Sequence, residues 1–358
     1  MMEILVLNAS FESITIIDSF KSIIWSDRYR KSGDFEMYLS MDEDLLRYIK
    51  QDNYLWVKES EHCMIIEDIS ITSDSEEGNH MMITGRSLES ILERRIVWGQ
   101  KVLKGKLQNA IEDLLTEAFI NPSIADRKID NFVFEKSTDP RILELEVDTQ
   151  FTGDNLYYVI QGLCNTHRLG FKIVLNEQNQ FIFSLYFGSD RSYNQNTNPY
   201  VIFSPSFENI INSNYITTKS AFKNVTLVAG EGEGASRKTL VVGSGSGLSR
   251  RELFTDARDI SSDVKGGTLS TAEYNAQLKA RGDENLSEYA AKTAFEGEVE
   301  ATRLFKYGED FFIGDIIQIA NEYGHEGRAY ISELIISQSE EGYSVHPTFE
   351  TIEEKGEN

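Results

Sequence analysis

The sequence predicts a mainly β protein with an α+β middle, in which two β-barrel domains are separated by a mixed α/β region and the second barrel carries a helical insertion. Three observations predict this class. Apolar and polar side chains alternate through residues 1–98, helical periodicity and a hairpin pattern follow in residues 99–215, and strand patterning returns at Phe295 and continues to Glu350. A chain of 358 residues can hold two or three domains with separate hydrophobic cores.

Residues 1–98 are expected to form the first barrel-like, tube-like domain. Residues 35–41 alternate between apolar and polar, and Ile65, Ile69 and Ile71 are expected to share one face of a later strand. Turn signals at KSGD and SEEGN separate these runs, as is typical of an antiparallel barrel or sandwich.

A helical and α/β middle domain is expected at residues 99–215. Apolar residues spaced three or four apart predict an amphipathic helix over residues 101–120, which the Asn121-Pro122 pair ends. A shorter helix is expected to begin near Leu156 and to end near Gly170, and residues 170–188 then have the pattern of a hairpin.

The second barrel domain is expected at residues 216–350. Two glycine clusters flank a short apolar run in residues 231–248, which predicts a projecting hairpin or loop. Residues 270–294 are expected to form a pair of helices, with Gly282 capping the end of the first and Asp283 the start of the second.

The charge and the cysteine content narrow the function classes. With 35 basic and 58 acidic residues the net charge is −23, which disfavours binding of DNA, RNA or a membrane by a basic face. Cys63 and Cys164 are too few for a disulfide framework and are expected to be buried thiols. No signal peptide and no apolar run near the ~20 residues of a membrane-spanning helix are present, so synthesis in a cytoplasm without a membrane anchor is expected.

The segment YFGSDRS, residues 186–192, has the composition of an active-site edge or a phosphate pocket. Ser189 or Ser192 would need a histidine base such as His167 or His325 to act as a nucleophile, and no G-x-S-x-G elbow surrounds either serine. We therefore favour a hairpin end in which an aspartate and a serine cap backbone amides and Arg191 pairs locally.

The sequence also favours structural roles for the residues of the other candidate sites. The glycines at 230, 232 and 234 and at 243, 245 and 247 lack the spacing of a phosphate-binding loop, and the glutamates between the first three would repel a phosphate. Cys164 and His167 are three residues apart on one predicted helix face, but a metal site would need further ligands, so a core cysteine beside a surface histidine is expected. No catalytic, cofactor-binding or metal residues are predicted, and no cofactor.

Several segments carry a family resemblance in the order in which they occur. They are WSDRYRKSGDFEMYL (25–39), ITGRSLESILERRI (83–96), YFGSDRS, VIFSPSFENI, FKNVTLVAGEGEG, SRRELF and DFFIGDIIQI (310–319). Together they resemble the tail hub proteins of siphophages and related contractile systems, which are tail-tip or baseplate-hub proteins related to the hub of T-even phages.

The resemblance implies a structural protein of the phage tail and no enzyme. It also implies a homotrimer, in which the two barrel domains of each chain make a pseudo-hexameric ring that continues the tail tube and genomic DNA passes through the lumen without specific binding. The implied partners are a distal tail or tail tube protein, the tape measure protein, and spike, receptor-binding or fibre proteins, and the implied location is the virion tail tip or baseplate. Within this family GDFEMYL and IGDIIQI look like barrel strands entered through a glycine turn, where Gly33 and Gly314 free the backbone and the following aspartates cap it.

Four questions stay open at this level. A tail-associated peptidoglycan or polysaccharide hydrolase that uses carboxylates is the alternative function, although strand patterning continues to about Phe349 and leaves only a short tail, residues 351–358, where some family members carry a hydrolase domain. The acidic residues are assigned partly to the wall of the lumen, where they would not hold a phosphate backbone, and the alternative is a generally acidic surface that aids solubility. Whether the tail contracts, and whether it belongs to a phage or a prophage-derived particle, is likewise open.

Overall fold

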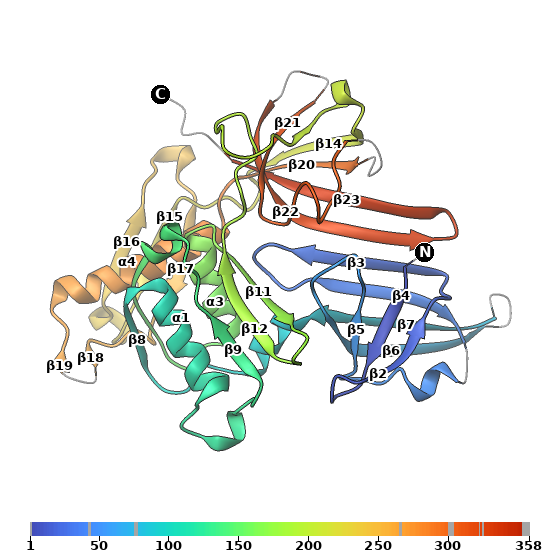
Figure 1. Ribbon diagram of the computed structural model, residues 1–358. Coiled ribbons are helices and arrows are strands. Elements are labelled where there is room, and N and C mark those ends of the chain that lie inside the picture. The colour runs from blue at the N-terminus through green and yellow to red at the C-terminus, as the bar shows by residue number, and fades with distance from the viewer. Residues whose placement is uncertain are drawn as a thin grey trace.

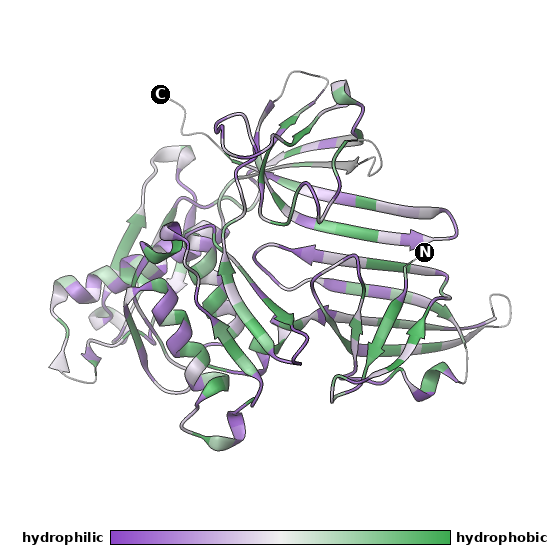
Figure 2. Cartoon of the chain, viewed as in Figure 1, coloured by the Kyte–Doolittle hydropathy of each residue, from purple (hydrophilic) through white to green (hydrophobic). Residues whose placement is uncertain are grey.

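The computed structural model describes residues 2–41, 44–74, 78–264, 267–299, 304–321, 323 and 326–352. Strands from the two ends of the chain lie side by side in one part of the molecule, and the middle of the chain forms the part beside them (Figure 1). Hydrophobic and hydrophilic residues alternate along many of the strands (Figure 2), as expected for sheets with one buried face.

The main element is a 13-stranded sheet built from both ends of the chain. Its strands follow the order β14-β20-β23-β22-β3-β4-β7-β6-β5-β1-β2, with β21 paired to β22 and β13 to β21. They are β1 (Ile4–Leu7), β2 (Ser13–Ile17), β3 (Ser22–Arg28), β4 (Asp34–Ser40), β5 (Tyr54–Trp56), β6 (Met64–Asp74), β7 (Gly78–Ser87), β13 (Ile202–Phe203), β14 (Ile210–Thr218), β20 (Lys292–Val299), β21 (Ile316–Ala320), β22 (Glu326–Ser339) and β23 (Gly342–Thr351).

This sheet confirms the mainly β class but not the two barrels. The first 98 residues and the C-terminal strands are joined by antiparallel pairing of β3 with β22, from Arg28 opposite Glu333 to Ser22 opposite Ser339. None of the sheets in the described part of the chain closes into a barrel. The alternation of side chains specifies which face of a strand is buried, but it does not specify which distant strand lies beside it.

One face of the long sheet covers the first hydrophobic core, which includes Trp25, Phe35 and Phe349. A β-bulge between Ile66 and Asp68 changes the side on which later residues of β6 point. Ile65 therefore belongs to the second core whereas Ile69 packs against the first, and the expectation that Ile65, Ile69 and Ile71 share one face is wrong for Ile65.

The middle of the chain packs around the second core. Its elements are β8 (Lys101–Lys106), α1 (Leu107–Leu115) continued by a π-helical turn (Thr116–Ile120), β9 (Phe132–Glu135), α2 (Pro140–Leu143), β10 (Glu146–Phe151), α3 (Leu156–Thr166), β11 (Gly170–Leu175) and β12 (Phe181–Tyr186). The helix expected over residues 101–120 is wrong in its first part, because residues 101–106 pair with β10 as a strand and the helix begins at Leu107. Helical spacing of apolar residues does not exclude a strand when a partner strand is available.

The second helix and the hairpin are confirmed. The Asn155 side chain accepts a hydrogen bond from the backbone N–H of Tyr157 at 3.0 Å, which caps the start of α3. The helix ends at Thr166, and β11 begins at Gly170 and pairs antiparallel with β12. Asn176 makes the turn, since its side-chain oxygen accepts the backbone N–H groups of Gln178 and Gln180.

Residues 225–288 form a separate small unit inserted between β14 and β20. The unit contains β15 (Val225–Ala229), β16 (Thr239–Gly243), β17 (Glu252–Asp256), β18 (Asp263–Val264), β19 (Gly267–Thr268) and α4 (Thr271–Glu288). Its sheet has the order β16-β15-β17, and α4 packs against that sheet and against α3 and β10. The domain boundary expected between residues 215 and 216 falls inside β14, and residues 231–248 include the paired strand β16.

The expected pair of helices is a single helix. Helix α4 continues through residues 281–283 to Glu288, and residues 292–299 belong to β20. A Cβ atom at Gly282 would lie 2.8 Å from a methyl group of Val228 and 2.8 Å from one of Val242. Gly282 therefore serves close packing of the helix on the sheet and not a helix end. No helix in the described residues is long and apolar enough to cross a membrane.

Candidate functional site

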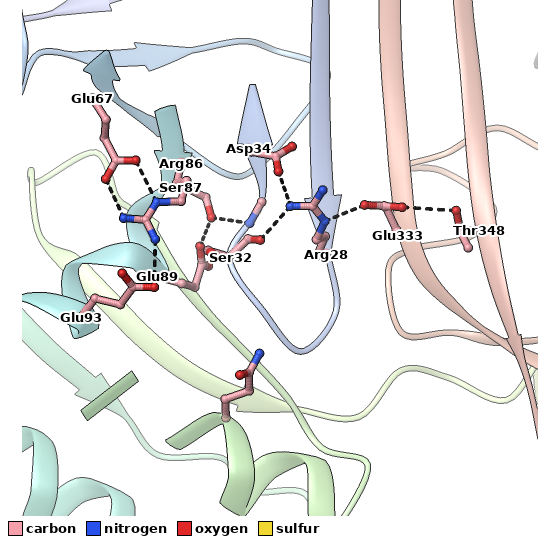
Figure 3. A network of polar contacts seen from close by, with 12 residues as sticks. Arg28, Ser32, Asp34, Glu67, Arg86, Ser87, Glu89, Glu93, Glu333 and Thr348 are labelled. Carbon is pink, nitrogen blue, oxygen red and sulfur yellow. Dashed lines mark hydrogen bonds and ion pairs between the residues drawn. The ribbon is translucent and has the colours of Figure 1, made fainter. Parts of the chain in front are cut away.

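Arg28 holds the two ends of the chain together where β3 meets β22 (Figure 3). Its Nε–H donates to Glu333 Oε1 at 2.5 Å, and its Nη1 donates to Asp34 Oδ2 at 2.5 Å and to the Ser32 carbonyl at 3.2 Å. Thr348 donates to the other oxygen of Glu333 at 3.3 Å. The network therefore links β3 and β4 to β22 and β23, which are separated by about 300 residues of sequence.

The face of the long sheet that points away from the first core is polar and continues across this pairing. Directly opposed residues form one row through six strands: Ser344 on β23, Ser337 on β22, Ile24 on β3, Glu36 on β4, Thr84 on β7 and Asp68 on β6. This row contains two carboxylates and no lysine or arginine. Arg28 and Arg86 lie elsewhere on the same face, and Lys21 Nζ lies 5.0 Å from the centre of the Tyr38 ring on that face.

Arg86 is also held between carboxylates. Its Nε and Nη2 donate to the two oxygens of Glu67 at 2.8 Å and 2.9 Å, and its Nη1 donates to Glu93 at 2.8 Å (Figure 3). Each of the two arginines thus faces two acidic groups, so neither offers an uncompensated positive charge to a passing anion.

The segment YFGSDRS joins the middle of the chain to the long sheet. The backbone N–H of Ser189 donates to Asp315 Oδ1 at 2.7 Å, and Arg191 Nε donates to Asp315 Oδ2 at 2.7 Å. Asp315 and Arg191 are both largely buried. The interpretation as a structural turn is supported, but the segment is not a hairpin end, since β12 pairs with β11 and β9 whereas the next strand, β13, pairs with β21. Arg191 also pairs with a residue 124 positions away and not locally. Asp190 does cap locally, since it accepts from the N–H and the hydroxyl of Ser192 at 2.9 and 2.6 Å.

Two glycines allow this junction to close. A Cβ at Gly188 would lie 2.0 Å from the carbonyl oxygen of Gly314, and Gly314 itself has a φ of +87° and lies against the ring of Tyr29. Asp315 accepts from the backbone N–H of Phe312 at 3.1 Å, so the expected glycine turn capped by an aspartate is confirmed there.

The corresponding expectation at Gly33 and Asp34 is wrong. Gly33 has no positive φ, and its lack of a side chain is needed because a Cβ would lie 2.1 Å from the Ser26 carbonyl oxygen. The Asp34 carboxylate pairs with Arg28 instead of capping the turn. Spacing alone does not distinguish a turn glycine from one that allows two strands to approach.

A buried cluster of charged residues lies beside the junction between YFGSDRS and the long sheet. The sequence did not predict it. His62 Nδ1 is 3.2 Å from Glu89 Oε1, and the Asp27 carboxylate accepts from the Ser60 hydroxyl at 2.7 Å. Burial alone would lower the pKa of His62, but the carboxylates of Glu89 and Asp27 raise it to about 9. Burial raises the pKa of Glu89, yet the histidine reverses this and holds that pKa below its ordinary value.

The Glu89 carboxylate also connects separate parts of the chain. It accepts the backbone N–H of Ile173 on β11 at 2.7 Å and the hydroxyl of Ser87, which in turn accepts the N–H of Gly33. Both His62 and Glu89 are almost fully buried, so the cluster fixes the middle of the chain to the first strands and is closed to a substrate. A serine, a histidine and acids do meet here, but no sequence motif brings residues 27, 60, 62 and 89 together.

The sequence candidates for chemistry do not converge. Burial raises the pKa of the Cys164 thiol well above its ordinary value, and burial lowers the pKa of His167, which ends helix α3. Ser189 lines a cavity of about 570 Å³, whose described lining residues include no histidine. His325 lies outside the described residues. Among the described residues no group of three potential metal ligands occurs.

A comparison with models of protein families shows which family the chain belongs to. The model of the Siphovirus ReqiPepy6 Gp37-like family matches residues 3–349. The chain belongs to this family. The resemblance to siphophage tail proteins that the sequence segments indicated is thereby confirmed.

The fold of this Gp37-like protein is that of known phage tail proteins. The chain resembles a 43 kDa tail protein of prophage MuSo2 from Shewanella oneidensis with a TM-score of 0.59 at 12% identity, covering 97% of this chain and 98% of that one. It resembles a tail protein from Neisseria meningitidis MC58 with a TM-score of 0.57 at 13% identity, covering 98% and 96%. A prophage tail protein, gp18, from Listeria monocytogenes EGD-e gives a TM-score of 0.50 at 13% identity over 99% and 95%. No curated protein sequence matches the chain.

Proposed function

We propose that this Gp37-like protein is a structural hub of a phage tail tip, in which three copies form a ring that continues the tail tube. The observation that carries the proposal is the β3–β22 pairing, which makes one continuous sheet from the first and last parts of the chain. A chain with two such β parts supplies six units to a ring when three copies assemble, so a three-fold component matches a six-fold tube.

The free edges of the sheet support ring closure. In the described residues, β14 pairs on one side with β20, and the part of β6 beyond Glu67 pairs on one side with β7. Unpaired strand edges are ready templates for another strand. In the proposed ring the β14 edge of one copy meets the β6 edge of the next.

The polar face supports DNA passage through the lumen. Its row of opposed residues carries Glu36 and Asp68 without a lysine, and Arg28 and Arg86 are each compensated by two carboxylates. Phosphate contacts by lysine and arginine release counterions and hold DNA, so a row of residues without lysine or arginine would let DNA slide. The proposed partners are the tail tube or distal tail protein on one side, the tape measure protein within, and spike or fibre proteins at the tip.

Native mass spectrometry of tail-tip complexes released from purified particles tests the copy number. The proposal predicts three copies of this chain per complex, and a complex with one or six copies would overturn it. The proposal also predicts that the purified chain does not clear a suspension of bacterial cell walls, because the clustered Ser60, His62 and Glu89 are buried. Clearing that the wild type produces and a Glu89→Gln variant does not would favour a hydrolase instead.

A further inference from the structure

The inserted unit, residues 225–288, leaves a row of apolar side chains exposed on its sheet. Val241 on β16 lies directly opposite Leu227 on β15, and Leu227 lies directly opposite Phe254 on β17. Their exposed fractions are 56%, 42% and 55%. Directly opposed residues point to the same face, so the three side chains form one continuous apolar row across the whole sheet.

The opposite face of the same sheet is already occupied. Val228 and Val242 pack there against Tyr274 and Leu278 of α4. A three-stranded sheet with one face on a helix is expected to carry polar residues on the other face. The fold of the unit leaves this row exposed apart from the Arg237 guanidinium, which lies 5.7 Å from the centre of the Phe254 ring. Contiguous exposed apolar side chains of this kind are typical of interaction surfaces.

The segment around the row has an excess of basic residues, unlike the rest of the chain, although four of these residues are paired with acids: Arg237 and Arg258 with Asp256, Lys238 with Glu231 and Arg250 with Glu252. Residues 219–258 contain seven basic and four acidic residues, whereas the whole chain has a net charge of −23. Leu248 is fully exposed in the turn before β17, and Arg250 and Arg251 follow it. Lys219 and Lys223 precede β15, which runs parallel to β17, so all four basic residues gather at the same end of the sheet.

We propose that this surface, the row of Val241, Leu227 and Phe254 together with Leu248 in the turn before β17, docks on the acidic surface of the neighbouring copy in the ring. The inference rests on the proposed trimer. Charge complementarity selects a second copy as the occupant, because the chain outside residues 219–258 is even more acidic than the chain as a whole. The contact is heterologous, as ring closure requires: the inserted unit of each copy meets a different surface on the next.

Two variants test the docking surface in the purified full-length chain. Leu248→Ser changes a fully exposed side chain, and the triple variant Leu227→Thr, Val241→Thr and Phe254→Thr keeps residues that suit strands. Tyr158→Ala, on α3, removes an apolar side chain that is 61% exposed and serves as the matched control. Self-association is measured by light scattering over a series of concentrations at low and high salt, and folding of each variant by circular dichroism.

The expected result is that the triple variant weakens association by about tenfold or more, that Leu248→Ser weakens it less, and that the control does not. Association of the wild type is also expected to weaken at high salt. Association that is equal in all variants would overturn the proposal and leave the hub intact, since the copy number in tail-tip complexes is measured separately. Wild type that stays monomeric at every concentration, or that binds vesicles of acidic phospholipid through this row, would likewise overturn it.

Discussion

Arg28 on β3 donates to Glu333 on β22 at 2.5 Å, across the pairing that joins the first and the last parts of the chain. The arginine is mostly buried and also pairs with Asp34, so its removal leaves two carboxylates without their partner. We expect Arg28→Leu to lower the free energy of unfolding by about 1–3 kcal/mol, measured by urea denaturation. Arg47→Leu is the control, since its pair with Asp44 is exposed and is worth about 0.5 kcal/mol or less. Equal effects of the two variants would mean that the Arg28 network does not stabilise the fold.

Variants of Asp315 and Ser189 test whether the segment YFGSDRS has a structural role. Asp315→Ala is expected to cost about 3 kcal/mol or more in unfolding free energy, because Arg191 and the N–H of Ser189 lose a buried partner. Ser189→Ala is expected to change stability by less than about 0.5 kcal/mol, since the backbone of Ser189 makes this contact and not its hydroxyl. A large loss of stability in Ser189→Ala, or none in Asp315→Ala, contradicts this description of the junction.

Alanine variants of Gly314 and Gly308 distinguish the stability cost of close packing from the cost of the backbone conformation. Both have positive φ, +87° and +81°, but a Cβ at Gly314 would lie 2.4 Å from the Tyr29 ring whereas Gly308 faces open space. Gly308→Ala is expected to cost about 1 kcal/mol for the backbone alone, and Gly314→Ala clearly more in thermal unfolding. If the two variants lose the same stability, the contact with Tyr29 is not what requires a glycine.

Glu284 is expected to make stability depend on pH at the α3–α4 contact. Burial raises its pKa to about 7, with Glu288, Asp154 and Asp259 adding to the effect of burial and Arg281 opposing it. Because the folded pKa lies above the unfolded value, the stability that this group contributes is present at low pH and is lost as pH rises from about 4.5 through 7. Glu284→Gln should therefore be more stable than wild type by up to about 3 kcal/mol above pH 7 and similar to it near pH 4. Parallel pH profiles of the two proteins in urea denaturation would contradict the assignment.

The sequence predicts a helix or strand correctly where the signals within a few residues agree with the fold. Asn155 caps α3 and Asn176 turns the hairpin through contacts within a few residues, so both were predictable. The strand at residues 101–106 was not predictable, because it forms by pairing with residues 146–151 and no local pattern indicates that pairing. Gly282 was interpreted as a cap because the contacts that require a glycine, with Val228 and Val242, lie 40 residues or more away in sequence.

The candidate site was harder to predict than the elements. The partner of Arg191 is 124 residues away, and the partner of Arg28 on β22 is 305 residues away. The His62–Glu89 pair combines a loop and a short helical segment without characteristic spacing. Alternation of side chains does indicate that Glu36 and Asp68 lie on a solvent-facing side of their strands, but it does not show that the β3–β22 pairing extends that face over both ends of the chain.

A cryo-electron microscopy reconstruction of the tail tip tests the hub proposal most directly. We expect three copies of this chain in one ring, with β14 of each copy beside β6 of the next and with Glu36 and Asp68 facing the channel. A ring of six copies, a single copy, or three copies whose channel is lined by basic residues instead of this polar face would contradict it.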